Sequence, residues 1–116
     1  MSTGSAREAM KPVILIVDDE KNTREGLRRG LESPAHELLL AADAAEALGV
    51  LTTRKVDLVL TDLRMPGESG LDLMRRARAA KSDAIFILLT AYGTVETAVQ
   101  AMKEGAYDYL TKPVNL

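Results

Sequence analysis

Strand-like apolar runs in this chain end repeatedly in side chains that can take part in chemistry. Four such runs, with the polar residues that follow them, are 13–17 (Asp18 and Asp19), 56–61 (Asp62), 84–89 (Thr90) and 107–111 (Lys112). In an open parallel α/β sheet, ligands bind outside the carboxyl ends of the strands, where the winding direction reverses. Residues at successive strand ends therefore converge, and we expect one site built from three acids, a hydroxyl group and a lysine.

The segments between these strands carry apolar residues at helical spacing. The expected inward-facing residues are Thr23, Gly26, Leu27, Gly30 and Leu31 in the first helix, Ala44, Ala47, Leu48 and Leu51 in the second, Leu71, Met74, Ala77 and Arg78 in the third, and Val95, Ala98, Val99 and Met102 in the fourth. The fourth helix is expected over roughly 94–104, and Gly105 is typical of a helix stop. Asn22 or a near neighbour is the expected N-cap of the first helix, and Asp43 is the expected N-cap of the second.

Strand and helix signals alternate in the order βαβαβαβαβ, with 36–41 as a further strand that has a charged start and is expected at an edge. Crossover connections between parallel strands predict a doubly wound α/β fold with helices on both faces. Near-continuous Val, Ile and Leu mark the first, third and fourth strands as central. We therefore expect a five-stranded parallel sheet with these three strands at its centre.

The composition favours one globular cytoplasmic domain. The 116 residues are 47% hydrophobic, which is enough for a core, and the net charge of −2 gives no basic surface for direct nucleic-acid binding. The absence of cysteine fits a reducing cytosol, and no apolar run approaches the roughly 20 residues of a membrane span. Residues 1–11 are expected to be a disordered leader or a remnant of expression, and residues 12–116 the domain.

Asp18, Asp19 and Asp62 are expected to lie within several ångströms of one another. Two like charges 4 Å apart repel by about 4 kcal/mol at an effective dielectric constant of about 20, so either one acid stays protonated or a cation joins them. Oxygen ligands without His or Cys favour Mg²⁺. Lys112 can pair with a carboxylate or hold a phosphoryl oxygen, and Thr90 offers a hydroxyl group. The simpler alternative is that the first two acids cap a helix.

Two other features are expected to be structural. The lone His36 has no partner for metal or triad chemistry, and the arginine-rich run 75–78 is expected to be a solvated helix face. The chain has neither a G-x-x-x-x-G-K-[ST] loop nor a G-x-G-x-x-G motif after the first strand, so nucleotide binding lacks its usual cradle.

Over residues 12–115 the chain resembles the receiver domain of two-component response regulators. The matching segments, in order, are Ile-Leu-Ile-Val-Asp-Asp-Glu (14–20), Thr-Asp-Leu-Arg-Met-Pro-Gly (61–67), Leu-Leu-Thr-Ala (88–91) and Tyr-Leu-Thr-Lys-Pro (109–113). The resemblance implies a flavodoxin-like α/β fold, with a five-stranded parallel sheet of strand order 2-1-3-4-5. It also implies a signalling domain that catalyses its own phosphoryl transfer and dephosphorylation, so the chain is not expected to be an enzyme acting on a separate substrate.

The resemblance also implies roles for individual residues. Asp62 is implied as the acceptor of a phosphoryl group from a sensor histidine kinase. Mg²⁺ is expected to bind Asp19, Asp62 and the backbone carbonyl of Arg64 directly, and Asp18 through water. Lys112 is expected to contact the phosphoryl oxygens or Asp62, in a cis peptide bond to the following proline. Thr90 is expected to bond to the acyl phosphate, and Tyr109 is the expected aromatic switch.

Residues 90–109 resemble the nitrogen-regulatory class, whose receivers precede an ATPase domain that activates sigma-54 polymerase. The expected partners are a sensor histidine kinase and the chain's own output domain, with ATPase and DNA-binding parts outside this sequence, and a homodimer is possible. Asn115 looks like the cap of a fifth helix that the sequence lacks. We expect a piece of a longer regulator, whose bare face is covered by another copy or a rearranged segment.

Two alternative functions use the same residues. A phosphatase of the haloacid dehalogenase type also has a strand-end aspartyl nucleophile and Mg²⁺, but needs a second acid two residues later. That position holds Arg64 after Asp62, and Glu20 after Asp18. A receiver-like interaction module that is never phosphorylated is expected to lose an acid, the acceptor or the lysine, and this chain retains all of them.

Overall fold

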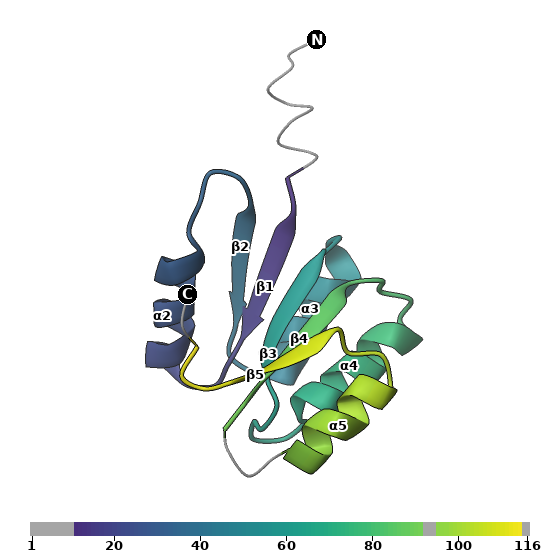
Figure 1. Ribbon diagram of the computed structural model, residues 1–116. Helices are drawn as coiled ribbons and strands as arrows, with labels where there is room; N and C mark the ends of the chain where they lie inside the picture. The colour runs from purple at the N-terminus through teal and green to yellow at the C-terminus, as the bar shows by residue number, and fades with distance from the viewer. Residues whose placement is uncertain (1–10, 92–94, 115–116) are drawn as a thin grey trace.

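The computed structural model describes residues 11–91 and 95–114, which form a parallel sheet with helices on both faces (Figure 1). The strands are β1 (Val13–Val17), β2 (Glu37–Ala41), β3 (Leu58–Asp62), β4 (Ile85–Thr90) and β5 (Asp108–Thr111). The helices are α2 (Lys21–Leu31), α3 (Ala44–Thr53), α4 (Gly70–Ala79) and α5 (Val95–Lys103). The sheet order β2-β1-β3-β4-β5 confirms the prediction. The expected leader, apart from Lys11, and the expected cap Asn115 lie outside the described residues.

Alternating side chains of the central strands divide the core between the two faces of the sheet. In β1, Leu15 and Val17 belong to the larger apolar cluster, which includes residues of α3 and α4, whereas Ile16 belongs to the cluster that includes Leu27 of α2. All three β1 side chains are fully buried. Complete burial of such a side chain stabilises the fold by about 1.5–3 kcal/mol, so the centre of the sheet is a firm support for the residues at its carboxyl edge.

The helix N-termini differ in how they are capped. Asp43 caps α3 as predicted, since its side chain accepts a 2.8 Å hydrogen bond from the N–H of Glu46. Helix α2 begins at Lys21, so Asn22 lies inside the helix and the cap is a near neighbour of Asn22. Its N-cap is Glu20, whose side chain makes no capping hydrogen bond within the described part of the chain. The start of α2 must therefore be held in another way.

The predicted inward face of α5 is wrong in part. Val99 and Met102 are 42% and 37% exposed, while Ala98 and Ala101 are completely buried. Helix α5 contacts the edge strand β5 and its neighbour β4, so it has only a narrow surface to cover. Small alanine side chains let the helix approach this surface closely, and the larger apolar side chains remain at the solvent. The side chain of Val95, which is also predicted to face inward, lies outside the part of the chain that the structure describes.

The other three helices also bury fewer residues than predicted. In α3 only Leu48 falls short, since it is partly buried. In α4, Leu71, Met74 and Ala77 are buried, but Arg78 is exposed and its guanidinium lies 5.4 Å from the ring centre of Phe86. In α2 only Leu27 is buried. A groove of about 530 Å³ runs beside this helix, lined by Thr23, Gly26, Leu27, Leu89, Ala91, Lys112, Pro113 and Val114. It leaves part of the α2 face of the sheet uncovered by the described residues.

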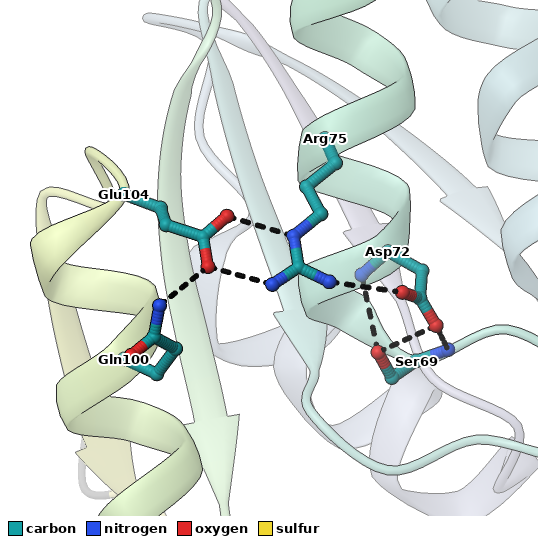
Figure 2. Close-up of polar contacts among 5 residues, drawn as sticks. All are labelled: Ser69, Asp72, Arg75, Gln100 and Glu104. Carbon is teal, nitrogen blue, oxygen red and sulfur yellow. Dashed lines mark hydrogen bonds and ion pairs between the residues drawn. The ribbon is translucent and has the colours of Figure 1, made fainter.

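Helices α4 and α5 are joined by a polar network (Figure 2). Arg75 of α4 donates from Nε and Nη2 to the two carboxylate oxygens of Glu104, at 2.7 and 2.6 Å, just beyond the end of α5. Gln100 donates to the same carboxylate at 2.9 Å, and Asp72 lies 3.5 Å from Arg75 and forms a capping box with Ser69. The expectation of a solvated face for 75–78 therefore holds only in part.

No helix among residues 11–91 and 95–114 has the length and apolar character needed to cross a bilayer.

Candidate functional site at the carboxyl end of the sheet

Three carboxyl groups meet at the carboxyl edge of the sheet. Asp18 directly follows β1 and Asp62 ends the neighbouring strand β3, so the parallel pairing brings them together. A carboxylate oxygen of each, and of Asp19, lies within 4.8 Å of the others. Asp18 is fully buried, Asp62 is 7% exposed and Asp19 is exposed. The predicted convergence of the three acids is confirmed.

Every polar group of Asp18 has a partner. Its N–H donates to the Ala41 carbonyl of β2 at 3.2 Å, and its own carbonyl accepts a 2.7 Å hydrogen bond from Nη1 of Arg24. Its carboxylate oxygens accept from the N–H of Glu20 at 2.9 Å and from Nζ of Lys112 at 2.8 Å. Asp18 is thus a fixed anchor at the floor of the site, and the alternative of a mere helix cap is wrong, because the N-cap of α2 is Glu20.

The ammonium group of Lys112 lies between two of the acids, 2.8 Å from Asp18 and 3.2 Å from Asp62. The main-chain N–H of Lys112 donates to the carbonyl of Thr90 at 2.9 Å, and its peptide bond to Pro113 is cis, as expected. Burial lowers the pKa of Lys112, but the hydrogen bond to Asp18 and the charges of both carboxylates act against this, so its pKa is raised overall. The lysine therefore remains charged at neutral pH.

The pKa of Asp62 is raised above its ordinary value. Burial is the largest cause, the positive charge of Lys112 lowers the pKa, and the negative charge of Asp18 raises it again. The N–H of Arg64 also donates to Asp62 at 3.3 Å. The positive charge of Lys112 therefore offsets only part of the free-energy cost of ionising the buried Asp62. Oxygen donors in this arrangement, without His or Cys, fit a hard divalent cation such as Mg²⁺.

Thr90 lies on β4, the neighbour of the strand that carries Asp62, and Tyr109 lies on the edge strand β5. Thr90 ends β4, is 4% exposed, and its hydroxyl group donates to the carbonyl of Ala91 at 2.9 Å. Tyr109 is partly buried on the edge strand β5, in register with Leu88, and its side chain packs against the larger apolar cluster. Thr90 pairs with Thr111 of β5, which directly precedes Lys112, so Thr90 and Lys112 lie at the same edge of the sheet. Tyr109 lies two residues before Thr111 on β5.

Two residues that support the site were missed by sequence reasoning. A Cβ atom at Gly70 would lie 2.4 Å from the main-chain oxygen of Asp62, so only glycine fits where α4 begins. The N–H of Gly70 also donates to the carbonyl of Leu63 at 2.9 Å. Arg24 is not among the residues of the first helix that are predicted to face inward, yet it reaches back to Asp18. For Gly70, the sequence signal is a glycine directly after a residue that can cap a helix, Ser69. For Arg24, the sequence contains no such signal.

The sequence profile of the response regulator receiver domain matches residues 14–116. The chain belongs to the response regulator receiver domain family. This receiver domain is 43% identical over 102 residues to the response regulator protein PilR of Pseudomonas aeruginosa, a match that covers 88% of the chain and 23% of PilR. The chain spans less than half the length of PilR and of other similar response regulators.

Solved structures of similar receiver domains have the same fold. A response regulator receiver domain protein from Clostridium thermocellum matches with a TM-score of 0.83 and 37% identity, over 90% of this chain and 84% of that one. A response regulator protein from Burkholderia pseudomallei, whose structure contains a phosphorylated aspartic acid, a calcium ion and citrate, matches with a TM-score of 0.81 and 35% identity, over 90% of this chain and 62% of that one.

Proposed function

We propose that this receiver domain is a phosphorylation-dependent switch in which Asp62 accepts a phosphoryl group from a sensor histidine kinase in the presence of Mg²⁺. The observation that carries the proposal is the position of Lys112, whose ammonium group contacts both Asp62 and the buried Asp18. The phosphorylated aspartic acid in the related Burkholderia structure supports an aspartyl acceptor. The domain is a signalling module and is not classed as an enzyme.

Asp62 is better suited to be the acceptor than the other two acids. Asp18 is fully buried, so a donor has no access to it. Asp62 is slightly exposed, at the end of a buried strand that fixes its direction. Asp19 is exposed in the loop, where it is suited to bind a metal ion together with Asp62 and the backbone carbonyl of Arg64.

In the proposed transfer, a carboxylate oxygen of Asp62 attacks phosphorus, and the bond from phosphorus to the donor nitrogen of the kinase histidine breaks. The histidine nitrogen keeps the electron pair, and Asp62 becomes an acyl phosphate. When bound, Mg²⁺ supplies positive charge against the phosphoryl oxygens. Lys112, which follows β5 and contacts Asp62 at 3.2 Å, supplies a second positive charge.

The new phosphoryl oxygens give Thr90 a second acceptor in competition with the carbonyl of Ala91. We propose that the Thr90 hydroxyl turns toward the acyl phosphate, that Tyr109 turns inward, and that the surface of α5 and β5 changes as a result. Amide exchange with and without a phosphate mimic tests this. Changes concentrated from Ala91 to Tyr109 support the switch, whereas changes confined to α2 and α3 contradict it.

The resemblance of residues 90–109 to the nitrogen-regulatory class supports an output that acts in transcription. We propose that residues 12–116 form the receiver part of a longer cytoplasmic regulator, whose ATPase and DNA-binding domains lie outside this sequence, and that the domain can pair with a second copy. The relatives compared are all much longer than the chain, which supports further domains.

Exposure to a small acyl or amido phosphate donor, with and without Mg²⁺, distinguishes this function from its rivals. A receiver gains one phosphoryl group per chain only when Mg²⁺ is present. Steady turnover of free phosphate esters would identify a phosphatase instead. A chain that neither gains mass nor turns over esters would be a receiver-like interaction module.

A further inference from the structure

Arg24 holds the main chain of the loop that carries the two adjacent acids. Its Nη1 atom donates a 2.7 Å hydrogen bond to the carbonyl oxygen of Asp18. Arg24 lies in the first turn of α2, where its own N–H donates to the carbonyl of Glu20 at 3.0 Å. The side chain therefore links the start of the helix back to the end of β1, across the loop at 18–20.

Beyond Asp18, which Ala41 and Lys112 also hold, few contacts restrain the rest of this loop. The side chain of Glu20 does not cap α2. Among the residues that the structure describes, the hydrogen bond between two residues of the loop runs from the N–H of Glu20 to the Asp18 carboxylate, at 2.9 Å. Asp19 is exposed, and its carboxylate has no hydrogen-bond or ion-pair partner in the part of the chain that the structure describes. The position of Asp19 therefore depends on the main chain on either side of it.

We propose that Arg24 is a positioning residue for the metal site, which fixes the main chain at Asp18 so that the Asp19 carboxylate stays beside Asp62. The proposal rests on the Mg²⁺ step of the proposed function. Groups that orient metal ligands without touching the metal typically change metal affinity by about 10–100-fold when they are removed. Arg24 contacts a main-chain carbonyl of the ligand loop, so we expect the lower end of this range.

Charge and geometry act in opposite directions at this residue. A guanidinium group near a cation site repels the cation, so loss of the charge alone would tighten Mg²⁺ binding. Loss of the hydrogen bond frees the loop and weakens binding. The direction of the change in Arg24→Gln therefore separates the two effects. Arg29→Gln is the matched control, because Arg29 is an exposed arginine of the same helix and the same charge is lost without the contact to Asp18.

Calorimetric Mg²⁺ titrations and urea unfolding of the wild type, Arg24→Gln, Arg24→Lys and Arg29→Gln test the proposal. We expect Arg24→Gln to bind Mg²⁺ about tenfold more weakly than Arg29→Gln. Arg24→Lys keeps a donor and should recover part of the loss. The proposal is overturned if Arg24→Gln binds Mg²⁺ as tightly as Arg29→Gln, or if only its urea midpoint falls while Mg²⁺ affinity stays unchanged.

Phosphoryl uptake by the wild type separates this result from a failure of the proposed function. A wild type that gains a phosphoryl group with Mg²⁺, beside an Arg24→Gln variant of normal Mg²⁺ affinity, overturns only the role of Arg24. A wild type that gains no phosphoryl group overturns the proposed function, while the comparison of Mg²⁺ affinities still decides whether Arg24 positions the acids.

Discussion

The ammonium group of Lys112 lies 2.8 Å from the carboxylate of Asp18, a residue with no exposed surface. These residues are 94 positions apart in the sequence and come from the ends of strands that are not neighbours in the sheet. Because Lys112 also contacts Asp62 at 3.2 Å, it uses carboxylate oxygens that a divalent cation would also attract. In the absence of a metal ion, the lysine is the main counter-charge of the site.

Replacement of Lys112 by methionine is expected to tighten Mg²⁺ binding while it slows phosphoryl uptake. The variant loses a positive charge that contacts two of the three acids. For a divalent cation and a single charge separated by about 5 Å, Coulomb's law in water gives about tenfold tighter binding once the charge is removed. Uptake falls because the transferred oxygens lose a charge partner. Lys103→Met, at an exposed position of α5, is the control in calorimetric titrations and labelling assays. Weaker Mg²⁺ binding in Lys112→Met would show that the lysine and the metal do not compete.

Asp62→Asn is expected to raise the free energy of unfolding at neutral pH without Mg²⁺. The pKa of Asp62 is raised in the folded chain, mainly by burial, so ionisation of this carboxyl group destabilises the fold. The protonated carboxyl group of Asp62 contributes its full stabilisation below the ordinary pKa of 3.8. This stabilisation is lost as the pH rises through the raised pKa of the folded chain.

Urea unfolding at a series of pH values tests this, with the exposed Asp83→Asn variant as control. The advantage of Asp62→Asn over the wild type should shrink as the pH falls toward 3.8, and excess Mg²⁺ should reverse it at neutral pH. A constant difference at all pH values would mean that the gain does not come from this ionisation.

Gly70→Ala is expected to destabilise the fold by about 1–3 kcal/mol and to weaken Mg²⁺ binding, because a Cβ atom there meets the Asp62 carbonyl oxygen at 2.4 Å. Gly49 is a suitable control, since it lies inside α3 with no atom within 4 Å of an added Cβ. Gly49→Ala should stabilise the fold by about 0.5–1 kcal/mol. Equal stabilities of the two variants in urea unfolding would show that α4 can move away from Asp62 at little cost.

Arg75→Gln is expected to loosen the C-terminal end of α5 at neutral pH. The guanidinium of Arg75 and the amide of Gln100 lower the pKa of Glu104 to about 2. A lowered pKa means that the ion pair contributes above the ordinary value of 4.5 and is lost as the pH falls through about 2. Amide exchange should become faster near the end of α5 in the variant, by an amount that shrinks at high salt, with α3 as an internal control. Unchanged amide exchange in α5 would show that the ion pair between Arg75 and Glu104 does not restrain this end of the helix.

Sequence periodicity predicts the central strands because parallel strands buried on both faces need continuous apolar runs. The strand order follows from the family resemblance. Sequence periodicity also places Asp18, Asp62 and Thr90 at one edge, since strand ends are local features. Contacts that depend on how helices lie on the sheet are not local. Gly70 against Asp62 and Arg24 against Asp18 arise from the entry angles of α4 and α2, which no sequence pattern specifies.

The orientation of α5 shows the same limit. Its apolar residues cover more of the helix surface than β4 and β5 can bury, so spacing alone does not reveal that Ala98 and Ala101 face inward. The helix follows the closest packing, and alanine permits it. The exposed Val99 and Met102 are a consequence that only the assembled fold reveals.

The most direct test of the account is peptide mapping by mass spectrometry after incubation with a small phosphate donor and Mg²⁺. We expect one phosphoryl group per wild-type chain, on Asp62, and none in Asp62→Asn or when Mg²⁺ is removed by chelation. Asp83→Asn should be labelled like the wild type. Incorporation of one phosphoryl group into Asp62→Asn at the wild-type rate, on any other residue, would contradict the assignment of Asp62 as the acceptor.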